Sequence, residues 1–241
     1  MTTRCEGCRD GAKFETPFSM AFQPIVDVET GRVFAPRLSF VERTARAPIP
    51  SCLPWMHRTA TLSISSAACG RSILRTRWTS QRTCLSINFM PTAVYEPRAC
   101  IRLTLAAASA VGFPTRNIIF EFTESERVEA DHLLGILRSY RDMGFLTAID
   151  DFGAGHAGLN LLAQFQPDIV KLDMDLIRGI DTDKPRRTIV RSVAGMLAEL
   201  GVRTVCEGVE TVDELQALRD LGLTLFQGYL LARPKFEGLA D

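Results

Sequence analysis

The chain has 241 residues, enough for one large domain or two small ones with a full hydrophobic core. Its 28 basic residues equal its 28 acidic residues, so no net basic field would recruit nucleic acid or an anionic membrane surface. No apolar run is long enough to span a bilayer, and residues 1–13 are too polar for a signal peptide. Seven scattered cysteines, an odd number, favour reduced thiols and a cytoplasmic location.

Residues 1–17 are expected to form a flexible leader. Cys5 and Cys8 make one Cys-x-x-Cys pair there, and because no second pair follows at a matching spacing, a zinc site is the weaker interpretation. From Met20 onward, expected strands alternate with expected helices, which predicts an α/β fold whose sheet closes into a TIM-like (β/α)8 barrel. The strands are expected at 21–28, 32–35, 85–88, 118–122, 146–150, 169–172, 202–206 and 223–227, and the helices at 98–111, 126–143, 159–165, 186–200 and 212–221.

One stretch combines a buried strand with two neighbouring carboxylates. Residues 146–149 form a short apolar run that ends on Asp150 and Asp151. Adjacent carboxylates repel each other unless a cation lies between them, and hard divalent cations prefer oxygen ligands. A solvated loop in which one Asp caps the next helix is the alternative. Because the pair follows a buried strand directly, metal binding is the preferred interpretation.

A dinucleotide-binding site is a second interpretation of the turn that follows. Gly153, Gly155 and Gly158 fit Gly-x-Gly-x-x-Gly after a strand, and Asp173 follows the next strand, as in Rossmann oxidoreductases. Against it, the preceding Asp pair would face a pyrophosphate with no cation between them. The pattern also normally opens a domain, whereas several strand–helix units precede it here.

Polar residues collect at the carboxyl ends of the expected strands. They are Asn88, Glu121, Asp150, Lys171, Glu207 and Gln227. Taken singly, Asn88 could cap a turn, Lys171 could extend to solvent and Gln227 could satisfy a strand end. In a barrel, however, these strand ends converge on the face where such folds carry their chemistry. Oxygen ligands for Mg²⁺ or Mn²⁺ beside a lysine suit metal-assisted phosphodiester hydrolysis.

Seven short segments along the chain carry a family resemblance. They are Phe22-Gln23-Pro24-Ile25-Val26, Ser86-Ile87-Asn88, Phe120-Glu121-Phe122-Thr123-Glu124, Asp150-Asp151-Phe152-Gly153, Val170-Lys171-Leu172-Asp173, Cys206-Glu207-Gly208-Val209-Glu210 and Gln227-Gly228-Tyr229-Leu230. In this order they resemble the EAL family, bacterial domains that hydrolyse cyclic di-GMP to linear pGpG. The resemblance implies an EAL-type barrel over residues 18–241, with its first strand antiparallel to the others, and cyclic di-GMP as its partner.

The same resemblance implies a role for each matching residue. The ligands of a two-metal site for Mg²⁺ or Mn²⁺ would be Asn88, Glu121, Asp150 and Asp151. Lys171 would hold the catalytic water, Glu207 would assist beside the metals together with Asp150, and Gln227 would contact the ligand. Glu124 would brace the loop after Asp151, and Glu210 would support the Glu207 loop. The family's Asp-Asp-Phe-Gly loop borders its dimer surface, which suggests a homodimer through the region after Asp151; His156 stands there where a Tyr is frequent.

One departure concerns the motif that names the family. The family has Glu-Ala-Leu near the end of its second strand, where the Glu is a metal ligand and an Arg soon after contacts the dinucleotide. Here Pro36-Arg37-Leu38-Ser39-Phe40 follows Ala35, and residues 36–84 lack helical or strand periodicity. This segment is rich in Arg, Ser, Thr and Pro, and a divergent insertion or a variable lid would account for it.

A frameshift is the other explanation. Pro36–Glu42 can be encoded as CCG-AGG-CTC-TCG-TTC-GTG-GAG, which from its third base becomes Glu-Ala-Leu-Val-Arg-Gly. Residues 58–64 give Asn-Arg-Tyr-Ser-Phe-Asp in the same shifted frame. Codon degeneracy leaves freedom in both strings, but their agreement favours two compensating frameshifts, in the gene or in its sequencing. The chain as encoded is therefore expected to be a weak or inactive phosphodiesterase, or else a non-catalytic cyclic di-GMP signalling or protein-interaction module.

Overall fold

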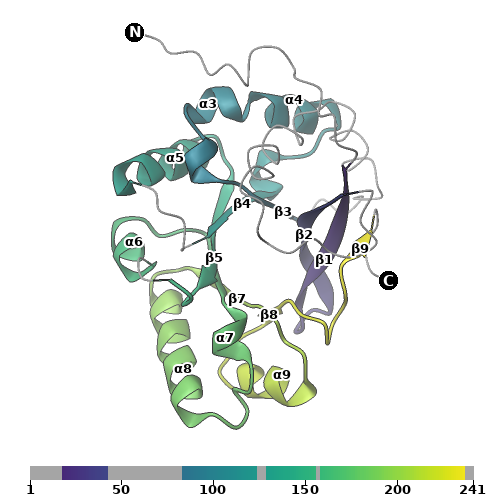
Figure 1. The fold of residues 1–241 in the computed structure, drawn as a ribbon, viewed down its shortest axis with the longest axis vertical. Coiled ribbons are helices and arrows are strands. Elements are labelled where there is room, and N and C mark those ends of the chain that lie inside the picture. Colours follow the sequence, from purple (N-terminus) through teal and green to yellow (C-terminus); the bar gives the residue numbers. More distant parts are fainter. Residues whose placement is uncertain (1–17, 43–82, 124–128, 156–157, 237–241) are drawn as a thin grey trace.

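The structure is a computed structural model that describes residues 18–42, 83–123, 129–155 and 158–236 (Figure 1). The strands are β1 (Phe18–Asp27), β2 (Arg32–Glu42), β3 (Leu85–Asn88), β4 (Ile118–Thr123), β5 (Leu146–Phe152), β6 (Ile169–Leu172), β7 (Arg203–Cys206), β8 (Leu225–Phe226) and β9 (Lys235–Phe236). The helices are α3 (Pro97–Cys100), α4 (Arg102–Ala110), α5 (Ala130–Asp142), α6 (Gly158–Gln164), α7 (Met174–Ile177), α8 (Lys184–Glu199) and α9 (Val212–Arg219), with short 3₁₀ turns at Pro91–Ala93 and Thr115–Asn117.

Strands β1 to β8 form a closed ring. β2 to β8 follow one another in parallel, and β1 closes the ring by pairing antiparallel with both β2 and β8. β9 adds to β1 through Ala21 and Phe22. The predicted TIM-like barrel with an antiparallel first strand is thus confirmed, and the open sheet of a Rossmann domain is wrong for this chain.

The β1–β2 hairpin differs from its sequence-based expectation. β2 was expected to end at Ala35, yet it continues through Glu42 because β1 pairs with it along its length, from Phe18 opposite Glu42 to Asp27 opposite Arg32. Backbone pairing therefore keeps residues 36–42 regular although their side chains show no alternation. The expectation of an irregular segment fails for these residues. Residues 43–82 of that segment and the expected leader 1–17, with its cysteine pair, lie outside the described residues.

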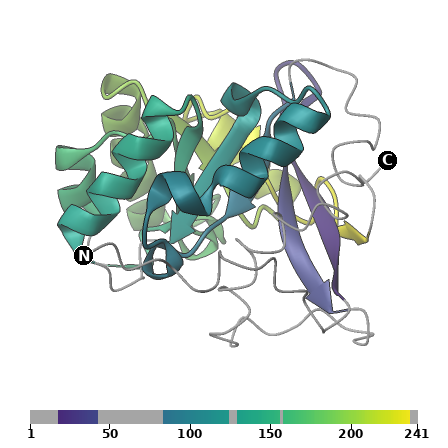
Figure 2. The same cartoon turned by 90° about the horizontal axis from the view of Figure 1, so that it is seen from above.

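The helices lie on the outside of the ring. The β1–β2 hairpin forms the side of the ring away from α5, α6 and α8 (Figures 1 and 2). Beneath α5, the ring of Phe120 lies 4.8 Å from that of Tyr140 and 5.1 Å from that of Phe145, measured between centroids. Such aromatic contacts add to the burial that holds helix and sheet together. Among the described residues, we find no helix that is both long enough and apolar enough to cross a membrane.

The interior of the barrel is filled by one small apolar layer. Each of the eight strands β1 to β8, or the residue beside it, contributes one member: Ile25, Ala35, Cys84, Ile119, Ala148, Ile169, Val205 and Leu225. All of them are buried. Side chains that fill the interior in this way make a TIM-like barrel a packed core and not a pore. Because strand side chains on one face recur every two residues, the next interior layer is fixed by this one.

Candidate functional site

The next interior layer is polar on every strand. Its members are Gln23, Arg37, Ser86, Glu121, Asp150, Lys171, Glu207 and Gln227, each two residues from the apolar layer. On β2 to β8 the polar residue follows the apolar one, and on β1 it precedes it because this strand runs the other way. The strand period therefore brings eight polar groups to the carboxyl-end mouth of the barrel.

Lys171 is the fully buried cation of this layer. Its side chain is 0% exposed, and its Nζ lies 2.8 Å from Asp150 Oδ1 and 3.2 Å from Glu121 Oε1. The same nitrogen also forms an ion pair with Glu207. Three strands, β4, β5 and β7, thus present a carboxylate to one ammonium group from β6. The sequence analysis expects these four residues, with Asn88 and Gln227, on one face of the barrel, and the structure places the four within one cluster of ion pairs.

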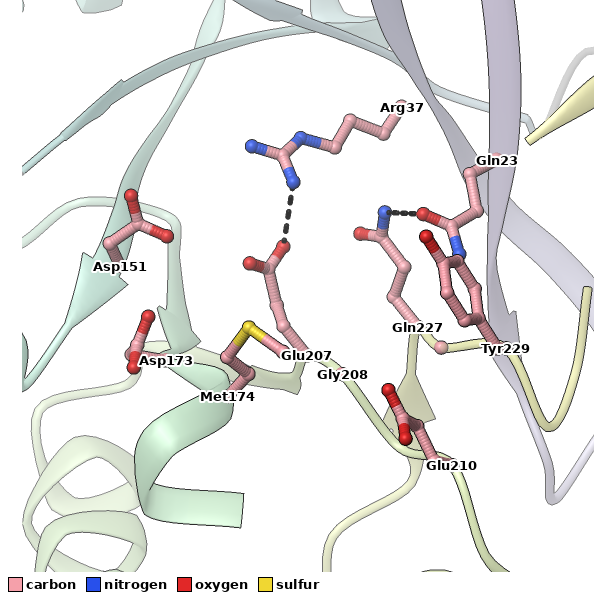
Figure 3. A pocket seen from close by; sticks show the side chains of 11 residues that line it. Gln23, Arg37, Asp151, Asp173, Met174, Glu207, Gly208, Glu210, Gln227 and Tyr229 are labelled. Atoms are coloured by element: carbon pink, nitrogen blue, oxygen red, sulfur yellow. Dashed lines mark hydrogen bonds and ion pairs between the residues drawn. The ribbon is translucent and has the colours of Figure 1, made fainter. Parts of the chain in front are cut away.

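Arg37 approaches the same three carboxylates from β2. Its Nη2 lies 2.5 Å from Asp150 Oδ2, its Nε 3.4 Å from Glu121 Oε2 and its Nη1 3.6 Å from Glu207 Oε1. Figure 3 shows the guanidinium extending from the hairpin across the mouth of the barrel towards Glu207. The side chain is 23% exposed, so one edge of the group borders the cavity above.

The two cations set the protonation of the layer. Burial would raise the pKa of Asp150, but Lys171 and Arg37 outweigh burial and hold that pKa below its usual value. Burial raises the pKa of Glu207 to about 7, against the opposing charge of Lys171. Burial and the Arg37 charge oppose ionisation of Lys171, yet the surrounding carboxylates raise its pKa above the usual range. Both cations therefore stay charged near neutral pH.

Two further predicted ligands stand above the layer. Asp151 follows Asp150 with a backbone φ of 53°, an unusual conformation for a residue other than glycine. Burial and the neighbouring Asp150 raise its pKa. Asn88 ends β3 opposite Glu121, and its buried Oδ1 accepts no hydrogen bond from the described residues. The structure thus brings all four predicted ligands to one end of the barrel.

Whether these residues fit a divalent ion depends on Arg37. One carboxylate oxygen from each of Asp150, Asp151 and Glu207 lies within 4.8 Å of the others, which is a suitable set of hard oxygen donors. However, both oxygens of Asp150 and both of Glu121 face a charged nitrogen of Arg37 or Lys171. With Arg37 in this position, the residues do not fit the two-metal site that the sequence predicts.

A cavity of about 280 Å³ opens directly above the layer. Arg37, Asp151 and Glu207 line one side of it, and Gln227 and Tyr229 line the other (Figure 3). The Nε2 of Gln227 donates to the Oε1 of Gln23 over 2.9 Å. The Nε2 of Gln23 in turn donates to the backbone carbonyl of Ala232 over 3.0 Å. This chain of bonds fixes the amide, and its Oε1 accepts no hydrogen bond from the described residues. The Tyr229 ring is 52% exposed beside it.

The loop after Glu207 is held by a residue that the sequence did not single out. Glu214 is buried, and its carboxylate accepts hydrogen bonds from the backbone N–H groups of Gly179, Glu210 and Thr211 over 2.9, 3.0 and 3.1 Å. Glu210, the predicted supporting residue, lines the cavity and pairs at the surface with Arg178 over 3.4 Å. Glu124 and His156 lie outside the described residues.

Sequence reasoning missed three members of the polar layer: Gln23, Arg37 and Ser86. Ser86 donates from its Oγ to Glu121 and so helps to hold that carboxylate. Gln23 and Ser86 stood within segments that carried the resemblance, but neither ends its strand. All three lie two residues from an interior apolar position, and this spacing would have identified them. The sheet register agrees, because Arg37 pairs with Gln23 on β1 and with Ser86 on β3.

Comparison with known proteins gives consistent matches. A family model described as EAL domain matches residues 14–234. The chain is 37% identical over 157 residues to the blue light- and temperature-regulated antirepressor BluF of Escherichia coli (strain K12), a match that covers 64% of this chain and 39% of BluF. It is 26% identical over 238 residues to the cyclic di-GMP phosphodiesterase PA2567 of Pseudomonas aeruginosa, covering 94% of this chain and 40% of that protein. The chain thus spans about two fifths of the length of these relatives.

Solved structures match the barrel closely. The crystal structure of a standalone versatile EAL protein from Vibrio cholerae O395, in its c-di-GMP-bound form, has a TM-score of 0.82 at 38% identity, covering 95% of this chain and 97% of that one. The manganese/cy-diGMP complex of Klebsiella pneumoniae BlrP1 at pH 9.0 has a TM-score of 0.81 at 32% identity, covering 93% of this chain and 57% of that one. Solved proteins of this fold therefore bind c-di-GMP, in one case together with manganese.

Proposed function

Because this chain belongs to the EAL domain family, we propose that it binds cyclic di-GMP in the cavity at the mouth of its barrel, and that its metal-dependent hydrolysis of that dinucleotide to pGpG is impaired. The observation that carries this proposal is the position of Arg37 among Asp150, Glu121 and Glu207. Arg37 in this position leaves the Gln227 and Tyr229 side of the cavity unchanged. It changes the side formed by the carboxylates, where divalent ions would be held.

The ligand side has the chemistry that a guanine dinucleotide requires. Gln227 offers a fixed amide whose Oε1 has spare capacity to accept a hydrogen bond from a base edge or ribose hydroxyl. Tyr229 offers an exposed ring, and aromatic rings provide stacking surfaces for bases. Arg37 borders the cavity with a guanidinium, which suits a phosphodiester anion. Among these, Gln227 is the residue we assign to ligand contact from the family resemblance.

The hydrolytic side retains most of the residues assigned to it. Lys171, Glu207 and Asp150 are the assigned catalytic residues, and Asn88, Glu121, Asp150 and Asp151 are the assigned ligands for Mg²⁺ or Mn²⁺. What is missing is a carboxylate at position 37, where the shifted reading frame would place the Glu of Glu-Ala-Leu. Position 37 belongs to the polar layer, which supports this alignment of the missing motif. Replacing a metal-binding carboxylate by a cation should weaken metal affinity and thereby turnover.

A paired assay tests the proposal. Binding of cyclic di-GMP is measured by calorimetry, and conversion to pGpG by chromatography, for the chain as encoded and for a frame-restored chain that has Glu-Ala-Leu-Val-Arg from position 37 and the shifted frame to Cys84. Both should bind, and the restored chain should turn over at least roughly 10- to 100-fold faster, since loss of even a supporting metal-site residue commonly has that effect. Glu121→Ala in the restored chain is the inactive control.

Equal turnover by the two chains would mean that position 37 is irrelevant, and it would refute the impairment. Absence of binding in both would refute the ligand assignment. An inactive signalling or protein-interaction module is the second candidate, favoured by the 37% identity to BluF, an antirepressor, and by the ion-paired state of the carboxylates. Retained binding with no turnover at any Mg²⁺ or Mn²⁺ concentration would decide for that candidate.

A further inference from the structure

The polar layer balances most of its own charge. Glu121, Asp150 and Glu207 supply three carboxylates, and Arg37 and Lys171 supply two cations. Lys171 contacts the three carboxylates from β6, and Arg37 contacts the same three from β2. Buried carboxylates that lack a counter-charge are strongly unfavourable, so a second cation beside Lys171 stabilises the charged form of this layer.

The contacts of Arg37 resemble those of a coordinated ion. Three different nitrogens each face a carboxylate from a different strand, at 2.5, 3.4 and 3.6 Å. The guanidinium is planar and permanently charged, and its donors can engage several carboxylates at once. Each oxygen of Asp150 and of Glu121 already faces either this group or Lys171. Both oxygens of Asp150 are therefore hydrogen-bonded to a cation, whereas Oε2 of Glu121 lies 3.4 Å from Arg37 Nε without a hydrogen bond between them.

We propose that the guanidinium of Arg37 is the resident cation of this site. It occupies the space among Asp150, Glu121 and Glu207 that a divalent ion would need, so the chain holds its carboxylate layer together without metal. Metal binding and the guanidinium exclude each other, and the site becomes a metal site only when Arg37 is replaced. This inference concerns the protein without ligand, and it stands or falls independently of cyclic di-GMP binding.

The test uses two substitutions of the same residue. Arg37→Gln removes the positive charge at similar side-chain length, and Arg37→Glu gives the layer four carboxylates against one lysine. Arg32→Gln is the matched control, because Arg32 is an exposed arginine on the same strand. Binding of Mn²⁺ is followed by the electron paramagnetic resonance signal of the free ion, and stability by thermal denaturation in EDTA and in Mn²⁺.

The wild-type chain and Arg32→Gln should leave the free Mn²⁺ signal unchanged and should unfold at the same temperature in EDTA and in Mn²⁺. Arg37→Glu should bind Mn²⁺ and, at one hundred times its dissociation constant, unfold about 5 to 10 °C higher than in EDTA. Arg37→Gln should be less stable than wild type in EDTA and recover part of the loss in Mn²⁺. A variant that folds only in Mn²⁺ would support the proposal equally.

Saturable Mn²⁺ binding by the wild-type chain, as tight as that of Arg37→Glu, would overturn the proposal. So would Arg37 variants that fold and bind no Mn²⁺, because removal of the guanidinium would then open no ion site. Failure of both variants to fold even with Mn²⁺ would also count against it, since the ion would not replace the guanidinium. None of these readouts requires cyclic di-GMP or catalysis.

Discussion

Replacement of Lys171 by methionine isolates the contribution of one buried charge. Lys171 is 0% exposed and forms ion pairs with Asp150, Glu121 and Glu207. Methionine retains most of the unbranched stem, so Lys171→Met removes the charge with little change in packing. Removing one partner of a buried ion pair typically costs about 3–5 kcal/mol of folding free energy, because the other charges remain without compensation. For a chain of this size, that loss lowers the melting temperature by about 6 to 20 °C.

The effect has a defined pH dependence. In the wild type the charge of Lys171 opposes the effect of burial, which raises the pKa of both Asp150 and Glu207, and the pKa of Glu207 is already about 7. Without Lys171, we expect the pKa of both groups to be higher in the folded variant than in its unfolded chain. The folded variant therefore takes up protons as the pH falls, which stabilises it relative to its unfolded state. Urea denaturation should show a deficit relative to wild type that is largest near pH 7.5 and shrinks towards pH 5. A deficit below about 1 kcal/mol, in the range of an exposed pair, would refute the reasoning, as would a deficit that grows on acidification. Lys184→Met, at an exposed position of α8, is the control.

Three other substitutions test the structure around the site and in one of the helices outside the barrel. Glu214→Gln should cost about 1–3 kcal/mol at pH 7, because the carboxylate accepts three backbone hydrogen bonds, and urea denaturation should show the difference vanishing in acid. Burial would raise the pKa of Glu214, but these hydrogen bonds outweigh burial and lower it. The carboxylate therefore stabilises the fold above its unfolded-state pKa, and this stabilisation is lost as the pH falls through the folded-state pKa. Gly228→Ala should cost about 1–3 kcal/mol or more in thermal denaturation, since a Cβ there would lie 2.0 Å from the carbonyl oxygen of Val209. Gly195→Ala in α8, where a Cβ would meet nothing within 4 Å, should instead stabilise by about 0.5–1 kcal/mol.

The barrel and most of its polar layer could be predicted from sequence because both depend on local patterns. Short apolar runs separated by helices with a buried stripe predict a parallel sheet, and the polar residue at the end of each run predicts the site. Expected and observed helices agree within a few residues at α8 and α9, where Gly201 and Gly222 follow the last turn with positive φ. The short α7 was not expected, because its four residues are too few for a periodic pattern.

Arg37 could not be placed by those patterns. The sequence showed the absence of a Glu and the loss of alternation after Ala35, which indicated an irregular segment. Pairing with β1 overrides this local pattern and extends β2 through Glu42. Once β2 continues, the two-residue period from Ala35 directs the next interior side chain, Arg37, into the layer. The pairing register between β1 and β2 therefore determines that Arg37 faces Asp150, and no local pattern in residues 36–42 does so.

The proposed separation between ligand binding and hydrolysis follows from how β7 and β8 are joined. Gln227 donates its backbone N–H to the carbonyl of Cys206 over 2.9 Å, and its own carbonyl accepts from Val209 over 3.2 Å. Gly228 lets these backbones approach so closely that no other residue would fit. The positions of Glu207 and Gln227 are therefore fixed relative to each other by main-chain bonds that do not involve β2. A change at position 37 alters the charge among the carboxylates and leaves this platform in place. We therefore expect the proposed ligand binding at this platform to survive a change that weakens metal binding, whereas loss of the platform would remove both.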